Sequence, residues 1–151
     1  MSSPLELILF MGLQASGKST YYKREFYNTH VRINLDMLRT RHRESILFKA
    51  CLEGKVRTVI DNTNLTEASR SAYILSAKAA KFVVRGYYFE SKLEDCMVSN
   101  QKRTGAQRIP DLAVISSSRR MELPSYEEGF DELYFVRKAG EGEFITEKWK
   151  L

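Results

Sequence analysis

Short apolar segments alternate with stretches of helical periodicity along the whole chain. The apolar segments predict strands at 5–10, 31–34, 56–60, 81–89 and 133–136. The periodic stretches predict helices at 17–26, 36–52, 66–80, 93–102 and 110–121. Because strands that alternate with helices in this way form βαβ units, the pattern predicts a single three-layer α/β domain over 1–151, with a parallel central sheet flanked by helices. The last apolar stretch, 144–149, fits either a terminal strand or a loose tail.

Local signals mark several of the expected helix ends. Thr66 is of the residue type that caps a helix N-terminus, Pro110 suits a first helical turn, and Gly54 is a residue type that often ends a helix. These residues set the expected start of the helices at 66–80 and 110–121 and the expected end of the helix at 36–52.

The segment after the first expected strand carries a phosphate-binding motif. It reads G-x-x-x-x-G-K-S/T from Gly12 to Ser19 and lies between a strand and a helix, as this motif requires. Gly12 and Gly17 allow backbone conformations that a side chain would block, so the loop amides can surround a phosphate. Lys18 supplies a cation for the β- and γ-phosphates, and the Ser19 hydroxyl is a hard oxygen ligand for Mg²⁺.

This motif predicts that the chain binds ATP, or another nucleoside triphosphate, together with Mg²⁺. The alternative is a glycine-rich turn that holds no ligand. The expected contacts come from Gly12, Leu13, Gln14, Ala15, Ser16, Gly17, Lys18, Ser19 and Thr20.

The composition is that of an ordinary globular chain with a basic balance. Hydrophobic residues make up 43% of the 151 positions and charged residues 28%, and the formal net charge is +5. A positive charge weakly favours an anionic partner such as nucleic acid. Basic residues cluster at 39–43, 102–108 and 119–120, although any one cluster can also be a solvated helix face.

The sequence gives no sign of a membrane segment or of a disulfide framework. No apolar run approaches the roughly 20 residues that span a bilayer, and the N-terminus lacks the basic region of a signal peptide, so we expect a cytoplasmic protein without membrane contact. Cys51 and Cys96 lack the spacing of a metal site, and we expect reduced thiols in the core.

A second candidate site follows the second expected strand. Asp36 lies at a strand-to-helix junction, where aspartate is also a favoured N-cap, so a structural role is the alternative. In phosphoryl transfer to an alcohol, a carboxylate accepts the hydroxyl proton, and Asp36 fits that role of general base. Arg39, three residues further on, is expected on the same helix face and suits a phosphate. Together they predict an acceptor with a hydroxyl beside a phosphate, as at the 5′ end of a polynucleotide.

Asp61 ends the third expected strand and opens a polar run. An acidic residue at this place resembles the Walker-B element, which helps to hold Mg²⁺, so we expect Asp61 and Ser19 at the metal. The run 62–64, which includes Asn64, is suited to orient waters or the phosphate oxygens of a substrate. The alternative is a turn that closes the strand.

The segment 101–110 joins two expected helices and is basic, which suits a lid. An arginine that closes over the transferring phosphoryl group would neutralise developing charge and exclude water. Arg103 is the first candidate and Arg108 the second, with an ordinary solvated loop as the alternative.

These residues resemble the kinase module of the polynucleotide 5′-kinases, such as that of the bacteriophage polynucleotide kinase/phosphatase. The resemblance extends from the phosphate loop to 129–133 and depends most on the blocks 33–39, 61–65 and 101–110. It implies an adenylate-kinase-like P-loop fold and transfer of the γ-phosphate of ATP to the 5′-hydroxyl of RNA or DNA. By position, it implies that Lys18 and Ser19 bind nucleotide and magnesium, Asp36 is the base, Arg39 grips the acceptor's 3′-phosphate and Arg103 contacts the donor phosphates.

The sequence departs from the two-domain members of that family in one respect. These residues contain no D-x-D-x-T motif, the nucleophile motif of the phosphatase module, so we expect no 3′-phosphatase activity from them. Related small P-loop kinases act on other alcohols, and some members have lost catalysis. A kinase for a small-molecule hydroxyl and a non-catalytic nucleotide-binding module therefore stay open as alternatives, as do the choice between RNA and DNA and the oligomeric state.

Overall fold

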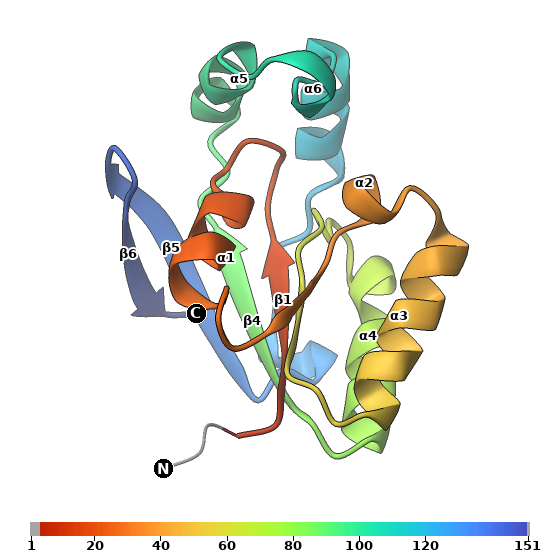
Figure 1. Ribbon diagram of the computed structural model, residues 1–151. Coiled ribbons are helices and arrows are strands. Elements are labelled where there is room, and N and C mark those ends of the chain that lie inside the picture. Colours follow the sequence, from red (N-terminus) through yellow and green to blue (C-terminus); the bar gives the residue numbers. More distant parts are fainter. Residues whose placement is uncertain (1–3, 151) are drawn as a thin grey trace.

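The computed structural model describes residues 4–150, and within them six strands form one sheet in the order β2-β3-β1-β4-β5-β6 (Figure 1). Neighbouring strands from β2 to β5 pair in parallel, and β6 pairs antiparallel with β5. The strands are β1 (Glu6–Met11), β2 (Val31–Ile33), β3 (Thr58–Ile60), β4 (Val83–Phe89), β5 (Glu132–Gly140) and β6 (Glu143–Lys148). The α/β architecture with a mostly parallel sheet confirms the fold class expected from the alternating pattern.

Helices cover both faces of the sheet because β1 is apolar on both sides. Ile8 and Phe10 pack against Tyr21 and Tyr22 of α1, while Leu7, Leu9 and Met11 pack against the opposite layer, formed by α3 and α4. The helices are α1 (Lys18–Glu25), α2 (Leu35–Leu38), α3 (Arg41–Glu53), α4 (Glu67–Ala79), α5 (Leu93–Gln101) and α6 (Asp111–Arg120), with short 3₁₀ turns η1 (Gly105–Gln107) and η2 (Tyr126–Glu128).

The helix expected at 36–52 is broken into α2 and α3, which corrects the sequence prediction. Arg39 has a φ of 79°, outside the helical range, and its amide donates to the carbonyl of Leu35 as the C-cap of α2. Thr40 then caps α3, its hydroxyl accepting from the Arg43 amide. The side chains of Asp36 and Arg39 therefore do not share one helix face.

The segment 144–149, left open by the sequence, belongs mainly to the edge strand β6. It pairs with β5 from Tyr134↔Lys148 to Gly140↔Glu143, so the C-terminal part of the chain forms a hairpin beside α1 (Figure 1). Phe144 of this hairpin packs edge-on against Tyr21 of α1, with ring centroids 5.3 Å apart.

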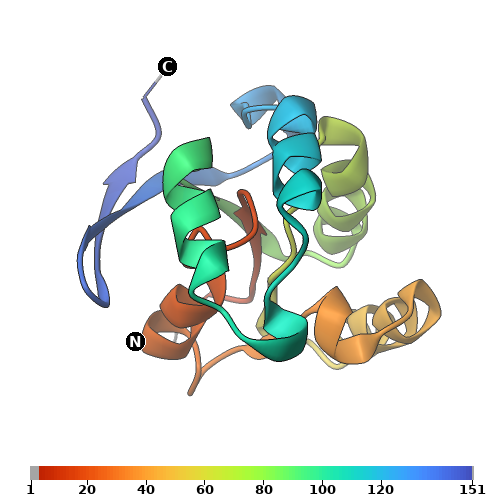
Figure 2. The same ribbon diagram turned by 90° about the horizontal axis from the view of Figure 1, so that it is seen from above.

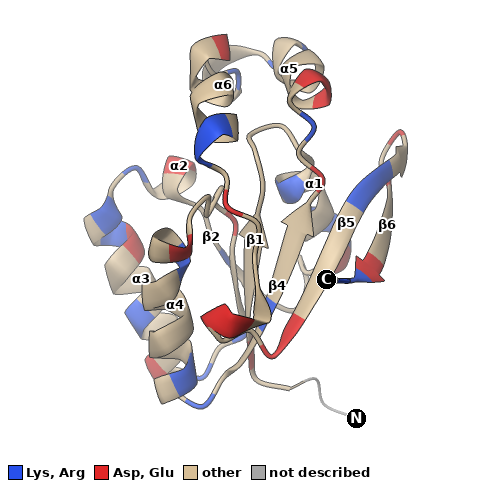
Figure 3. Cartoon of the chain, turned by 180° about the vertical axis from the view of Figure 1, so that it is seen from behind, with Lys and Arg blue, Asp and Glu red and all other residues tan. Residues whose placement is uncertain are grey.

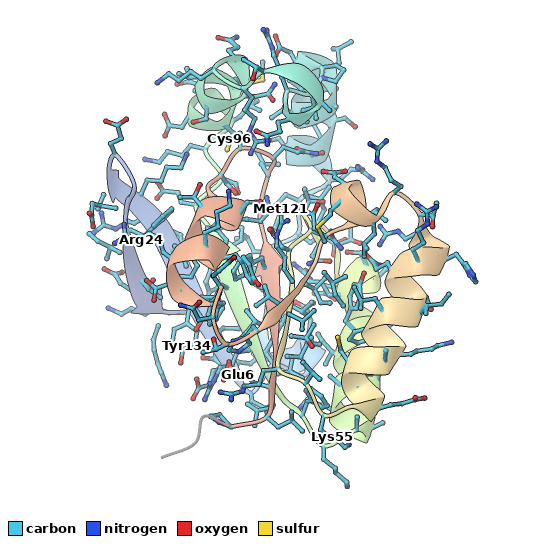
Figure 4. All side chains as sticks on the ribbon, viewed as in Figure 1. Glu6, Arg24, Lys55, Cys96, Met121 and Tyr134 are labelled. Carbon is cyan, nitrogen blue, oxygen red and sulfur yellow. The ribbon has the colours of Figure 1, made fainter. Side chains whose placement is uncertain are left out.

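The two helices α5 and α6 lie beyond the carboxyl ends of the strands, over the loop that joins β1 to α1 (Figures 1 and 2). Their underside is apolar, and Cys96 and Val114 pack there with Leu13 and Leu65. Figure 4 shows Cys96 between α5 and that loop. Both cysteines are buried and unpaired, as expected for core thiols. None of the described helices is long and apolar enough to cross a membrane.

Candidate active site

The phosphate loop has the backbone shape that its two glycines were expected to allow. Gly12 and Gly17 have φ values of 150° and 102°, and a Cβ on Gly12 would lie 3.1 Å from the side chain and carbonyl of Phe89. Two of the bonds that fix the loop from outside start from its own amides: the amide of Gly12 donates to the carbonyl of Thr63 at 3.0 Å, and the amide of Leu13 donates to Oγ of Ser91 at 3.0 Å. The loop is therefore held in place by the turns after β3 and β4.

Lys18 is buried at the mouth of this loop. Its Nζ donates to the carbonyl of Gly12 at 2.9 Å and to the carbonyl of Leu13 at 2.6 Å. Burial lowers the pKa of the ammonium from 10.5 to about 8, and the nearby carboxylates of Asp61 and Asp36 offset this only in part. A desolvated ammonium of this kind binds an anion strongly, since little hydration is lost when a phosphate arrives.

Ser19, in the first turn of α1, lies in contact with Asp61, which directly follows β3. Oγ of Ser19 donates to Oδ2 of Asp61 at 3.0 Å, and Asp61 is only 1% exposed. Arg32 of β2 closes the group, with Nε 2.8 Å from Oδ2 of Asp61 and Nη2 3.0 Å from Oγ of Ser19. A hydroxyl and a carboxylate are the hard oxygen donors that Mg²⁺ prefers, so these two side chains fit a magnesium site.

The remaining ligands of such a site would be phosphate oxygens and water. The described residues contain no group of three or more metal-ligating side chains. Mg²⁺ in phosphoryl-transfer sites typically takes one or two protein ligands together with substrate phosphates.

Asp36 is not the N-cap of its helix, so the capping role that the sequence left open for this residue is wrong. Asn34 caps α2 instead, its Oδ1 accepting from the amide of Met37 at 2.9 Å, while its Nδ2 donates to the carbonyl of Asp61 at 2.6 Å. The Asp36 carboxylate lies in the first turn of α2 and lines a cavity with the phosphate loop.

That cavity has a volume of about 350 Å³ and brings together most of the residues expected in the site. One wall is the phosphate loop and the other is α2 and the turn after β3. Its lining includes Gln14, Ala15, Lys18, Ser19, Asp36, Asp61, Asn64 and Arg103. Asn64 is also a structural residue here, because its Nδ2 donates to the carbonyl of Phe10 at 2.7 Å and its φ is 44°.

Two of the expected residues lie elsewhere. Arg39, at the break between α2 and α3, and Arg108, at the end of η1, are both exposed, and neither lines this cavity. Among the described residues, the guanidinium groups at the cavity wall belong to Arg41, Arg103 and Arg120.

A second cavity of about 300 Å³ lies on the other side of the phosphate loop. It is formed by Gly17 and Thr20, by Ser99 of α5, and by the hairpin from Lys138 to Phe144. Ala15 and Arg103 line both cavities, so the phosphate loop and Arg103 separate two neighbouring spaces.

Sequence reasoning missed Arg32, Arg41 and Arg120. Arg41 and Arg120 were noted only as members of basic clusters, and only their approach to the cavity distinguishes them from their neighbours. Figure 3 shows basic residues in the last turn of α6, which faces α2 across the top of the sheet. Arg32 lies within an expected strand, and the available signal was a charged residue between the two apolar residues Val31 and Ile33.

The parallel sheet, the phosphate loop with its buried lysine, and the Ser19–Asp61 pair define a P-loop nucleotide-binding domain. The chain belongs to the AAA domain family, whose model matches residues 7–124.

The chain is also homologous to proteins named polynucleotide phosphatase/kinase. It is 31% identical over 132 residues to the bifunctional polynucleotide phosphatase/kinase of Schizosaccharomyces pombe, covering 83% of this chain and 32% of that one. It is 30% identical over 153 residues to the putative bifunctional polynucleotide phosphatase/kinase of Acanthamoeba polyphaga mimivirus, covering 96% and 36%. The chain thus spans about one third of the length of these relatives.

Among solved structures, Chaetomium thermophilum Kti12 in complex with ADP-AlF3 has a TM-score of 0.67 at 17% identity, over 87% of this chain and 88% of that one. Because this match covers 87% of the chain, the two proteins share their fold over nearly its whole length. The homology with the two phosphatase/kinases confirms the resemblance expected from the three sequence blocks.

Proposed function

We propose that this chain is an ATP-dependent polynucleotide 5′-hydroxyl kinase, which transfers the γ-phosphate of ATP to the 5′ end of RNA or DNA. The observation that carries the proposal is the larger cavity, in which Asp36 lines the same space as Lys18, Ser19 and Arg103. A general base facing a phosphate-binding loop is the arrangement that phosphoryl transfer to an alcohol requires. The two homologous phosphatase/kinases support the polynucleotide as acceptor.

The donor binds with its phosphates in the loop and its nucleoside in the second cavity. The loop amides and the N-terminus of α1 face the phosphates, and the Lys18 ammonium neutralises the β- and γ-phosphates. Ser19 and Asp61 would hold Mg²⁺, which would supply positive charge against the phosphate oxygens. Thr20, Lys138 and Phe144 line the space left for ribose and base.

The acceptor enters the larger cavity with its 5′-hydroxyl toward Asp36. The carboxylate accepts the hydroxyl proton while the oxygen attacks the γ-phosphorus in line. The bond from the γ-phosphorus to the β–γ bridging oxygen breaks, and ADP leaves. Arg103, which borders both cavities, stabilises the charge on the transferring group.

An acceptor screen tests this function. The purified chain is given labelled ATP with 5′-hydroxyl RNA, 5′-hydroxyl DNA, a nucleoside 3′-monophosphate, or a panel of small neutral alcohols, and the product is analysed for a 5′-phosphate. We expect transfer to a 5′-hydroxyl end, with a KM for the oligonucleotide that rises with salt as phosphate contacts are screened. Transfer only to a neutral alcohol would assign a small-molecule kinase instead, and ATP binding without transfer to any acceptor would indicate a nucleotide-binding module.

A further inference from the structure

Arg32 is a partly buried arginine that the proposed mechanism does not use. It lies on β2, and Cζ of its guanidinium lies 5.9 Å from the centroid of the Tyr22 ring of α1. Its Nε lies 2.8 Å from Oδ2 of Asp61, and its Nη2 lies 3.0 Å from Oγ of Ser19. One cation therefore contacts both of the oxygen donors that fit a magnesium site.

This guanidinium lies behind the two donors and not in the space for the nucleotide. Ser19 and Asp61 both line the larger cavity, whereas Arg32 lines neither of the two cavities. On Asp61, Oδ2 accepts from Ser19 and from Arg32, while within residues 4–150 no group donates to Oδ1. A metal ion that reaches the pair from the cavity can therefore leave the contacts of Arg32 in place.

Arg32 neutralises the carboxylate on which such a metal site depends. The Asp61 side chain is 1% exposed, so salt in the solvent screens this ion pair little. Within the described part of the chain, Arg32 makes an ion pair with no other carboxylate, and the two side chains together carry no net charge. Because the affinity of an oxygen site for a divalent cation depends on the negative charge of its ligands, an arginine on the same carboxylate lowers that affinity.

The same arginine also holds the two oxygen donors together, which by itself would favour a metal ion. This gain is small, because Oγ of Ser19 donates to Oδ2 of Asp61 at 3.0 Å and joins the two donors without help from Arg32. The repulsion is larger, since a divalent ion interacts with the guanidinium twice as strongly as a single charge at the same distance would. The repulsion therefore decides the direction of the net effect.

We propose that Arg32 makes nucleotide binding less dependent on Mg²⁺. Without a cation beside it, the Asp61 carboxylate would repel the phosphates in the loop, and Mg²⁺ would be needed to neutralise it. With Arg32 in contact, the loop accepts metal-free nucleotide more readily and Mg²⁺ adds less affinity. Arg32 is a positioning residue, because it acts through Asp61 and Ser19. The inference rests on the donor site of the proposed function and not on its acceptor.

Calorimetric titration with a non-hydrolysable ATP analogue tests this proposal. The Kd is measured in EDTA and in saturating Mg²⁺, and the first value divided by the second gives the metal dependence. Arg32→Gln removes the charge, Arg32→Lys retains it, and Arg57→Gln, on the segment before β3, is the control. We expect Arg32→Gln to raise this ratio about tenfold or more, and the other two variants to leave it within about threefold of the wild-type value.

An Asp61→Asn background shows whether Arg32 acts through this carboxylate. The charge that Arg32 neutralises is then gone, so Arg32→Gln should change both Kd values by a similar factor and leave their ratio within about twofold. A tenfold rise of the ratio in this background would contradict the proposal, because Arg32 would then act on the nucleotide by another route. An equal rise in Arg32→Lys and Arg32→Gln would contradict it as well, because the charge would then not be the cause.

Two results with Arg32→Gln alone would overturn the proposal. If both Kd values rise alike and the ratio stays the same, Arg32 only supports the fold. If the ratio falls, Arg32 assists the metal ion by holding its donors.

Failure of the proposed function is a separate result. If the wild-type chain transfers phosphate to no acceptor but Arg32→Gln raises the ratio, the function fails and this inference stands. If the wild-type chain phosphorylates 5′ ends and Arg32→Gln leaves the ratio unchanged, the inference fails and the function stands. A wild-type chain that binds the nucleotide under neither condition would overturn both.

Discussion

Arg32 and Asp61 form an ion pair at the centre of the expected magnesium site, with Nε 2.8 Å from Oδ2. The carboxylate is 1% exposed and the arginine side chain 26%, so the pair joins a buried acid directly after β3 to a partly accessible arginine on β2. The second nitrogen, Nη2, reaches Ser19, and the guanidinium therefore holds the two oxygen donors together.

The first prediction concerns this pair. Arg32→Gln leaves the buried carboxylate of Asp61 with Ser19 as its one remaining side-chain donor within residues 4–150, and we expect a loss of about 1–3 kcal/mol in the free energy of unfolding. Urea denaturation measures this. Arg57→Gln, on the segment before β3, is the control and should cost less than about 0.5 kcal/mol; equal losses in the two variants would contradict the assigned pairing.

The second prediction separates nucleotide binding from folding at Lys18. Its ammonium is desolvated, and burial lowers its pKa to about 8, so Lys18→Met removes a charge that is costly in the free protein. We expect a melting temperature equal to or above that of the wild type, together with a loss of roughly 100-fold or more in ATP affinity. Thermal melting and calorimetric titration with ATP check both parts. Unchanged affinity would contradict the role of Lys18 in the phosphate loop.

The third prediction contrasts Asp36 with the residue that caps its helix. Because Asn34 is the N-cap of α2, Asn34→Ala should cost about 1 kcal/mol of stability, whereas Asp36→Asn should cost less than about 0.5 kcal/mol. For phosphate transfer the order reverses, and Asp36→Asn should lower kcat by about 100-fold or more while ATP binding stays nearly intact. Parallel loss of ATP binding in Asp36→Asn would indicate a structural role for this carboxylate instead.

The fourth prediction tests the second cavity as the place of the donor's nucleoside. Nζ of Lys138 lies 3.3 Å from the carbonyl of Ala15, at the outer side of the phosphate loop. We expect Lys138→Gln to raise the KM of ATP by about threefold to tenfold and to leave the KM of the acceptor unchanged. Arg137→Gln is the matched control, because successive residues of a strand point to opposite faces. If the two variants have the same effect on the KM of ATP, this cavity does not hold the nucleoside.

The fifth prediction concerns packing between neighbouring strands of the sheet at Gly86. A Cβ on Gly86 of β4 would lie 2.6 Å from Cδ2 of Leu133 and 2.8 Å from Cε of Met11. Gly86→Ala should therefore destabilise the protein by about 1–3 kcal/mol through overpacking. Chemical denaturation measures the change. Gly54→Ala, where φ is −78° and the nearest atom to the added carbon is the carbonyl oxygen of Ala50 at 3.1 Å, should cost less, and the reverse order would contradict the packing described for this face of the sheet.

Much of the fold followed from local patterns. The alternation of apolar strands and periodic helices predicted the α/β class, and Thr66 caps α4 as expected, with its side chain accepting from the Ser69 amide. The break at Arg39 was not predictable in this way, because residues 36–52 have ordinary helix propensities and the break is fixed by contacts outside the segment. In one of those contacts, Nδ2 of Asn34 donates to the carbonyl of Asp61 in the turn after β3. In another, Oδ1 of Asn62 accepts from the amide of Leu35 in the first turn of α2.

The phosphate loop, by itself, is a local property of the sequence. Its glycines, lysine and serine are consecutive, and the backbone shape they allow depends on few distant residues, so the motif predicts the nucleotide site without a structure. The cavity that contains Asp36 together with that loop is not local. It exists because β3 lies between β2 and β1, which brings the turn after β3 and the start of α2 to the same end of the sheet as the loop.

The sequence by itself determined that this chain folds as a P-loop domain and where its phosphate loop lies, since both depend on neighbours along the chain. Only the tertiary structure decided which arginine of the cluster at 39–43 lines the cavity. Arg41 does so because Glu44, one turn away, and Tyr73, on another helix, hold its guanidinium there. Tyr73 is far from Arg41 in the sequence, so the local pattern of residues does not predict this contact.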